Sequence, residues 1–244
     1  MAHERLRVYD KALSFVRLAA PKVDAWPSAR CVRDQIDRAM ESSVTNLAKA
    51  AWLQPSRKSV YYLECSLGSV LESAACLDVA WIYDLIDKEM ATSRKLILWE
   101  IANMEIGLRK VWCSSVREEA GEYGEKGHGF PHESLLVYRR GVQLCQVLVR
   151  SVIGSGTPRT RYARRIDEAL TSLLLNIAEG NGRFTQMDHH QFIATAEESC
   201  SKLATYLDLS ASVEPRAIDT AKALLHEVMA MLGALKGYLE NERV

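Results

Sequence analysis

The sequence predicts an all-α protein, folded as two tandem up-down-up-down left-handed four-helix bundles. Three observations support this prediction. Apolar residues recur with a helical period in every candidate element, the two halves of the chain resemble each other, and a glycine-rich stretch separates them. The predicted domains are residues 1–118 and residues 132–244, joined by a linker at 119–131.

The internal repeat consists of four segments that recur in the same order. HERLRVY at 3–9 returns as HESLLVY at 132–138, and QIDRAMESSVTNLAKA at 35–50 aligns with RIDEALTSLLLNIAEG at 165–180. The serine at 69 and the Leu-Asp pair at 77–78 match those at 199 and 207–208, and Glu100, Met104 and Leu108 match Glu227, Met231 and Leu235. The offset stays at about 130 residues, which indicates duplication of one unit of about 115 residues.

Helix boundaries follow from capping and breaking residues. Trp26-Pro27-Ser28 separates the first two helices, and a polar stretch at 118–131 with four of the 13 glycines separates the two units. In the second unit, Thr157-Pro158 is expected to open the second helix, Thr185 to Asp188 to cap the third, and Pro215 to stand near the start of the last.

Apolar seams define the predicted core faces. The last helix has the clearest seam, with a spacing of three and four residues, and its counterpart in the first unit is expected at Ile97, Ile101, Met104, Leu108 and Val111. The corresponding residues of the last helix are Ile218, Ala221, Leu225, Val228, Leu232, Leu235 and Leu239. Short connections make successive helices antiparallel neighbours, which gives four helices per unit.

Composition excludes several function classes. The 31 basic residues balance the 31 acidic ones, and each half is separately neutral, with 18 of each sign in 1–126 and 13 of each in 127–244. A general polyanion binder would be basic, so nucleic acid is not favoured as a partner by net charge. No long uninterrupted apolar run predicts a membrane span, and the six cysteines form no CxxC, so we expect a cytoplasmic protein with buried, reduced thiols.

Motifs for catalysis and cofactors are not recognisable in the sequence. There is no GxGxxG, no P-loop and, on the predicted helices, no Glu-x-x-His of the kind that di-iron bundles use. His189 and His190 are adjacent, so on a helix they diverge by about 100° and do not chelate one metal easily. We therefore predict a protein without enzymatic activity, catalytic residues, metal or cofactor.

Two asparagines at equivalent seam positions are the first candidate binding residues. Asn46 and Asn176 each interrupt an apolar seam, and a buried amide needs hydrogen-bond partners. In one interpretation they set helix register, with Ser42 and Ser172 one turn earlier as partners or bystanders. In the other, Asn176, Glu179 and Arg183 surround a small polar site at the helix end, although the first unit has Lys49 and Ala50 where the second has Glu179 and Gly180.

Arginine clusters near the start of the second helix of each unit are the second candidate. Arg159, Arg161, Arg164 and Arg165 cluster in the second unit, and Arg30, Arg33 and Arg38 in the first. One interpretation is a solvated face neutralised by Asp34, Asp37, Asp167 and Glu168. The other is a contact with RNA or another anion.

The pattern of the second unit resembles a known family. Leu-x-Val-Tyr, then Ser-x-x-x-Asn-Ile-Ala-Glu-Gly-x-Gly-Arg at 172–183, then Gln191-Phe192 and Ala-x-x-Ser at 196–199 resemble the 23S ribosomal RNA intervening-sequence proteins, whose fold the accessory proteins of diversity-generating retroelements share. The resemblance implies a non-enzymatic four-helix bundle, usually one per chain and assembled into pentamers. Its retroelement members associate with a reverse transcriptase and with nucleic acid through a basic surface. This chain departs in being tandem and neutral, and in lacking Glu-Gly after Asn46.

These observations predict a non-enzymatic interaction or scaffold protein. Its partner is expected to be a protein or ribonucleoprotein, such as a reverse transcriptase complex, or a further copy of the chain. The alternative is direct RNA or DNA binding through the two arginine clusters.

Overall fold

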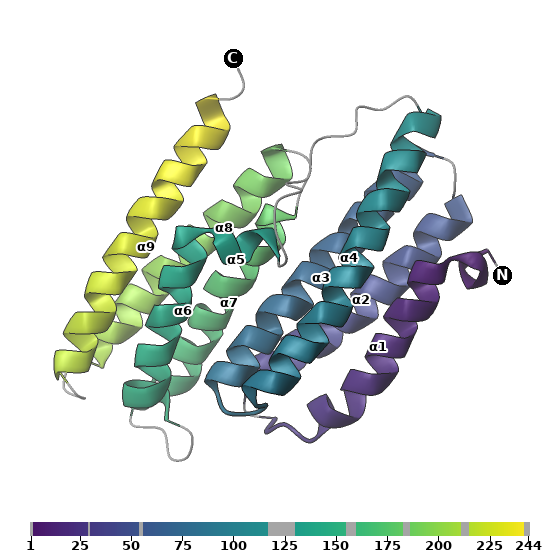
Figure 1. Ribbon diagram of the computed structural model, residues 1–244. Helices are drawn as coiled ribbons and strands as arrows, with labels where there is room; N and C mark the ends of the chain where they lie inside the picture. Colours follow the sequence, from purple (N-terminus) through teal and green to yellow (C-terminus); the bar gives the residue numbers. More distant parts are fainter. Residues whose placement is uncertain are drawn as a thin grey trace.

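The computed structural model describes residues 2–28, 30–53, 56–116, 130–154, 160–182, 186–210 and 215–241. All regular secondary structure in these ranges is helical, which confirms the predicted fold class. The helices form two groups that lie side by side (Figure 1). The first helix group comprises α1 to α4, and the second comprises α5 to α9.

The first helix group begins with a 3₁₀ turn at His3–Arg5. Its long helices are α1 (Arg7–Asp24), α2 (Cys31–Leu53), α3 (Arg57–Ile82) and α4 (Lys88–Val116). Each helix contacts the next in the chain, and α4 also contacts α1, which closes the group around one core. The predicted break at Trp26-Pro27-Ser28 falls between α1 and α2, as expected.

The second helix group repeats this order. Its elements are α5 (Pro131–Ser134), α6 (Leu136–Leu148) with a π-helical turn at Val149–Ile153, α7 (Ala163–Asn181), α8 (Gln186–Leu209) and α9 (Pro215–Asn241). Contacts join α6 to α7, α7 to α8, α8 to α9, and α9 to α6. Pro215 is the first residue of α9, as predicted, and Thr185 lies outside the described residues. Thr157 and Pro158 also lie outside them, but α7 begins only at Ala163, after a bend and turn at 160–162, so the prediction that this helix opens at Pro158 is wrong.

The tight connection between α3 and α4 is an αL cap that the sequence did not predict. Asp84 has φ 57°, a region that non-glycine residues rarely adopt. The Leu85 N–H donates to the Ala80 carbonyl at 2.9 Å, and the Asp84 N–H donates to the Trp81 carbonyl at 3.0 Å. These two bonds are those of a Schellman motif, and they satisfy carbonyls that the end of α3 leaves without helical partners.

The predicted seam of α9 is largely correct. That of α4 is correct only in part, because Ile101 is buried and Ile97, Met104 and Leu108 are half-buried, but Val111 is exposed. In α9, six of the seven predicted positions are buried, and Leu235 is half-buried. In α4, Val111 is 61% exposed, and the buried face runs through Leu98, Ala102, Glu105, Arg109 and Trp112. The seam was misplaced because two charged residues occupy the true core face and break its apolar period.

The tryptophans differ in burial, and the thiols follow their prediction in part. Trp52 is 76% exposed, while Trp26 and Trp112 are buried. The six thiols are free, and those of Cys76, Cys113, Cys145 and Cys200 are buried. Burial raises the pKa of Cys200 to about 12, so this thiol stays protonated at neutral pH.

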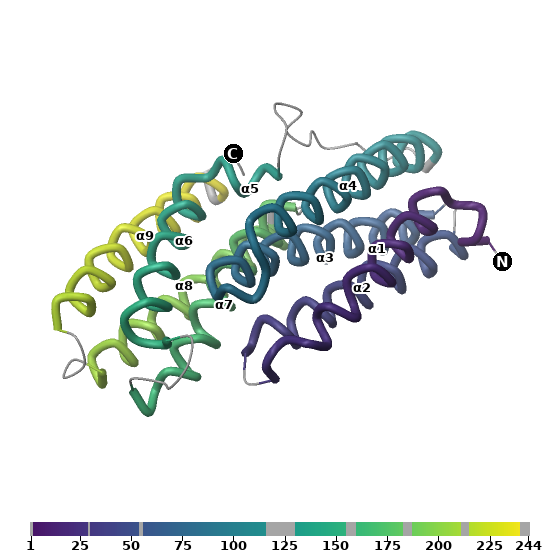
Figure 2. The backbone as a smooth tube through the Cα atoms, turned by 60° about the horizontal axis from the view of Figure 1, so that its bottom comes forward, coloured from purple at the N-terminus to yellow at the C-terminus, as the bar shows by residue number. Residues whose placement is uncertain are grey.

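The two groups meet through helices that are not equivalent in the repeat. The third helix of the first group, α3, packs on the second helix of the second group, α7, with further contacts from α2 to α7 and from α3 to α6 (Figure 2). A pseudo-dimer with a two-fold axis would pair equivalent helices. The observed junction is instead heterologous.

Helix α3 lies between the two cores. Within the described residues it is the helix long and apolar enough to cross a membrane, with a mean hydropathy of 1.3 over its best window, and 72% of that window is buried. Its apolar composition is explained by contacts with α2 and α4 on one side and α7 on the other.

Candidate functional site

The two seam asparagines occupy the same local arrangement in both groups. The Asn46 side-chain amide donates to Ser42 Oγ at 3.1 Å, and Ser69 Oγ on α3 donates to Ser42 Oγ at 2.8 Å. In the second group, the Asn176 amide donates to Ser172 Oγ at 3.2 Å and to the Ser172 carbonyl at 2.7 Å, and Ser172 Oγ lies 2.9 Å from Ser199 Oγ on α8. The serines are therefore partners of the asparagines, and each network links the second helix of its group to the third.

Two of the three residues of the predicted polar site, Asn176 and Glu179, lie within the described residues. Glu179 is half-buried one turn beyond Asn176, and Arg183 lies outside the described residues. The glycines of the same motif have a clear role in packing. A Cβ at Gly180 would lie 2.8 Å from Phe192 Cβ on α8, and a Cβ at Gly182 would collide with Leu71 on α3. Gly182 thus permits close approach of the two helix groups.

The arginine clusters are largely engaged with the protein itself. Arg164 is exposed and pairs with Glu168 at 3.0 Å, and the Arg161 guanidinium lies 5.4 Å from the Tyr162 ring centroid. A side-chain hydrogen bond with Tyr206 raises the pKa of the exposed Arg165, and Arg159 lies outside the described residues. In the first group, Arg33 Nη1 donates to the Trp26 carbonyl at 3.0 Å, and Arg38 Nε donates to the Asp34 carbonyl at 3.3 Å.

Arg30 and Asp167 belong to the junction and not to a solvated face. Arg30 Nη2 donates to the Gly154 carbonyl at 2.7 Å, and its guanidinium stacks 4.6 Å from the Tyr83 ring centroid. Asp167 is 2% exposed and accepts from the Tyr83 hydroxyl at 2.5 Å and from the Cys31 N–H at 3.4 Å. The interpretation of Asp167 as a solvated counter-ion is therefore wrong, because the packing of α7 on α3 buries it.

A second polar cluster links α3, α4, α5 and α6. Lys95 Nζ on α4 donates to Asp78 Oδ1 at 2.7 Å and pairs with Glu133 of α5, while the Tyr138 hydroxyl donates to Asp78 Oδ2 at 2.9 Å. Burial raises the pKa of Asp78, and the charge and hydrogen bond of Lys95 oppose that rise. Burial lowers the pKa of Lys95, but the two carboxylates outweigh it and raise the pKa overall.

His132 lies next to this cluster, and its imidazole is fully buried. It is 0% exposed, it lies between the rings of Phe130 and Tyr138, and among the described residues neither ring nitrogen has a hydrogen-bond partner. Burial, with a further contribution from the Lys95 charge, lowers its pKa to about 3. Asp78, His132 and Glu133 offer three ligand atoms within 4.8 Å of one another, but both carboxylates already pair with the Lys95 ammonium.

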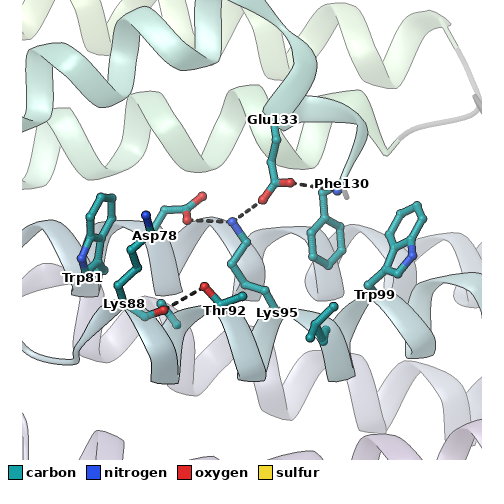
Figure 3. Close-up of a pocket in the computed structure, with 10 residues that line it drawn as sticks. Asp78, Trp81, Lys88, Thr92, Lys95, Trp99, Phe130 and Glu133 are labelled. Carbon is teal, nitrogen blue, oxygen red and sulfur yellow. Dashed lines mark hydrogen bonds and ion pairs between the residues drawn. The ribbon is translucent and has the colours of Figure 1, made fainter. Parts of the chain in front are cut away.

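A groove lies beside the ion pairs, and its lining residues are drawn in Figure 3. Its volume is about 320 Å³, and the ion-paired Asp78, Lys95 and Glu133 are part of its lining. Aromatic side chains form its walls, and Leu96 at its edge is 58% exposed. The wall residues are Trp81, Trp99 and Phe130, with Ala91, Thr92 and Lys88 beside them. Phe130 was predicted to lie in the linker, but it is buried. Its ring packs edge-on against that of Trp99, with 5.5 Å between the two ring centroids.

A separate buried carboxyl lies inside the first helix group. Glu105 is 1% exposed, its Oε1 accepts from Ser66 Oγ at 2.5 Å, and its Oε2 has no hydrogen-bond partner. Burial raises its pKa to about 8, so it is mostly protonated at neutral pH. The equivalent positions of the second group hold Leu232 and Ala196, which shows that the fold accepts an apolar pair here.

Sequence reasoning missed the residues of the junction as site residues. The signal was present, because Asp78, His132, Glu133 and Tyr138 all lie in the segments that define the repeat. Those segments predicted only the duplication. The sequence does not show which helix faces of the two groups pack against each other, so it could not identify the residues that this contact buries.

Comparison with known proteins gives one match. Residues 133–235 match the model of the 23S rRNA-intervening sequence protein family. Searches of curated proteins and of solved structures give no match. The matched region covers α6 to α8 and most of α9, and it includes the Asn-Ile-Ala-Glu-Gly segment that suggested the family. The second helix group is therefore similar to the 23S rRNA-intervening sequence proteins over residues 133–235, a region that begins at Glu133, the residue that pairs with Lys95 of the first helix group.

Proposed function

We propose that the protein is a non-enzymatic interaction scaffold made of two tandem four-helix bundles, and that it binds a protein partner in the groove between α3, α4 and α5. The partner class includes the protein component of a ribonucleoprotein, such as the reverse transcriptase complexes of retroelement accessory proteins. The observation that carries this proposal is the aromatic groove with exposed Leu96 at its edge. Clustered aromatic side chains beside a desolvated polar centre are typical of binding hot spots.

Equivalent pairs in the two helix groups support the duplication. Asp78 and Lys95 pair at 2.7 Å, and their counterparts Asp208 and Lys222 pair at 2.5 Å. The His132 and Tyr138 rings lie 4.7 Å apart, and those of His3 and Tyr9 lie 4.6 Å apart. These side chains come from the first, third and fourth helices of a bundle and from the turn before its first helix, which supports a shared arrangement as well as a shared sequence.

The outward faces of the two copies disfavour continued head-to-tail stacking. The α3 stripe that faces the second group contains buried Gly68, Leu71 and Ala75, and the equivalent α8 positions are exposed Glu198, Ser201 and Thr205. At the other end, buried Thr171 and Leu175 of α7 correspond to exposed Glu41 and Thr45 of α2. Polar outer faces are typical of terminal repeats, and they favour a different protein over a further copy of this chain as the partner.

The chemistry of the groove supports a non-catalytic role. The charged residues Asp78, Lys95 and Glu133 in its lining are paired with one another, and the adjacent His132 is sealed from solvent. A base with a pKa of about 3 is too weak to accept a proton in catalysis at neutral pH.

Site-specific photocrosslinking in the native host tests the proposal. A photoreactive residue replaces Leu96 in the groove, and the control carries it at Leu18, which is 47% exposed on α1 of the same group. We expect a discrete cross-linked protein from position 96 that is absent from position 18 and is lost in a Trp99→Ala background. Equal cross-linking at both positions, or a metabolite that fills the groove and raises the melting temperature, would contradict the scaffold role.

A further inference from the structure

The first helix group ends in a surface that combines cations with exposed aromatic rings. We call it the basic end; it consists of Lys49 and Trp52 on the last turns of α2 and of Arg57, Lys58 and Tyr61 on the first turns of α3. All five residues are exposed, Trp52 to 76% and Tyr61 to 55%. Lys49 Nζ lies 5.4 Å from the Tyr62 ring centroid, which confirms that the α2 and α3 parts of this surface adjoin.

The second helix group carries none of these residues at the equivalent positions. The five residues of the basic end correspond, in order, to Glu179, Gly182, Met187, Asp188 and Gln191. Three cations are thereby exchanged for two acids and a methionine, and both exposed rings are lost. Because both groups share their core arrangement, this difference is not required by the fold.

Neighbouring helix ends add to the positive charge. The start of α1 and the last turns of α4 lie at the same end of the first group (Figure 1), and they contribute exposed Arg5, Arg7 and Lys110. Among the described residues at this end of the first group, the acidic side chains are Glu4, Asp10 and Glu64. Of these, Glu64 accepts a hydrogen bond from Arg109 Nε at 2.6 Å. The neutrality of the whole chain therefore conceals a local cationic surface.

We propose that the basic end binds single-stranded nucleic acid. Cations attract the phosphate backbone, and exposed indole and phenol rings provide faces on which unpaired bases stack. Duplex bases are already stacked on one another, so the aromatic contribution specifically favours single strands. The site lies on a different surface from the arginine cluster of α7 and from the groove, so its failure leaves the scaffold proposal untouched.

Fluorescence polarisation with the full-length protein tests this site. The probes are labelled oligo(U) and oligo(dT) of about 20 nucleotides, a duplex of the same length and a labelled poly-glutamate peptide, at about 50 mM salt. We expect both single strands to bind more tightly than the duplex and the peptide. The ratio of the first two affinities shows whether RNA or DNA is preferred.

The triple variant of the basic end takes its new residues from the equivalent positions of the second helix group. Lys49→Glu, Arg57→Met and Lys58→Asp together should weaken single-strand binding at least about tenfold and reduce the log–log salt slope by about 2. Trp52→Ala should weaken binding about tenfold with the salt slope unchanged. The control Arg161→Ala, Arg164→Ala and Arg165→Ala removes three cations from α7 and its start and should leave the affinity unchanged.

Thermal unfolding verifies that all variants remain folded, so that a loss of binding reports on the surface. The proposal is overturned if the wild-type protein binds no single strand at low salt or if the control loses as much affinity as the triple variant of the basic end. Poly-glutamate binding as tight as oligo(U) binding would also overturn it, by identifying an acidic polypeptide as the occupant.

Discussion

The Tyr83 hydroxyl of the first helix group donates a 2.5 Å hydrogen bond to Oδ1 of Asp167 in the second group. Both side chains are buried, and burial is the main cause that raises the pKa of each. The Arg30 guanidinium stacks on the Tyr83 ring and donates to the Gly154 carbonyl, so one polar cluster joins several segments across the junction. This cluster gives the junction a specific geometry that apolar packing alone would define less strictly.

Tyr83→Phe is expected to destabilise the protein by about 1–3 kcal/mol, because it removes a donor from a buried carboxylate. Asp167→Asn introduces a side chain that is close in shape to aspartate but carries no charge. It should lower the free energy of unfolding less in the Tyr83→Phe background than in the wild type. A double-mutant cycle measured by urea unfolding gives the coupling energy. Additive effects of the two changes would show that the bond contributes nothing to stability.

Lys95→Met should be far more damaging than Lys222→Met, although the two lysines are repeat equivalents. Lys95 pairs with two carboxylates at a partly enclosed site, and its loss leaves Asp78 and Glu133 as adjacent like charges, a cost of about 3–5 kcal/mol for a buried pair. Lys222 and Asp208 are more exposed, and surface pairs contribute about 0–1 kcal/mol. Denaturant titration of both variants tests this; equal losses would mean that the junction does not bury the first pair in solution.

Gly182→Ala is expected to destabilise the protein by about 1–3 kcal/mol, because the new methyl group would overlap Leu71 across the junction. Gly233→Ala is the matched control, since a Cβ at Gly233 on α9 meets no atom within 4 Å. That change should stabilise the protein by about 0.5–1 kcal/mol through the higher helix propensity of alanine. Calorimetry distinguishes the two, and a stabilising Gly182→Ala would rule out close docking of α7 on α3.

The free energy of unfolding should depend on pH through Glu105. Its pKa is about 8 in the folded protein and about 4.5 when exposed, so between these values the folded state binds the extra proton. Stability from this group is thus fully present below pH 4.5 and falls by up to about 1.4 kcal/mol per pH unit as pH rises towards 8. Glu105→Gln should flatten this part of the profile relative to wild type.

His132 acts with the opposite sign at lower pH. Its folded pKa of about 3 lies below the ordinary value of 6.5, so its contribution is lost as pH falls from 6.5 towards 3. Differences between wild type and Glu105→Gln isolate the Glu105 contribution, because both proteins keep His132. A pH-independent difference between them would contradict the burial of a neutral carboxyl.

The sequence by itself determined the helical class and several helix boundaries, and it predicted the repeat. These features are local or periodic: Pro215 begins α9 because its fixed φ suits a first helical turn, and the α9 seam is correct because apolar residues alone occupy its core face. The α4 seam failed where Glu105 and Arg109 lie inside, since their partners Ser66 and Glu64 come from another helix.

Only the tertiary structure decided which repeated residues became a site. Asp78–Lys95 and Asp208–Lys222 have the same residues and nearly the same separation, and they differ in what covers them. The heterologous junction places Glu133, His132 and Tyr138 over the first pair, whereas the second remains more exposed. Burial, charge pairing and the groove follow from that contact, because desolvation depends on neighbours that are distant in the chain.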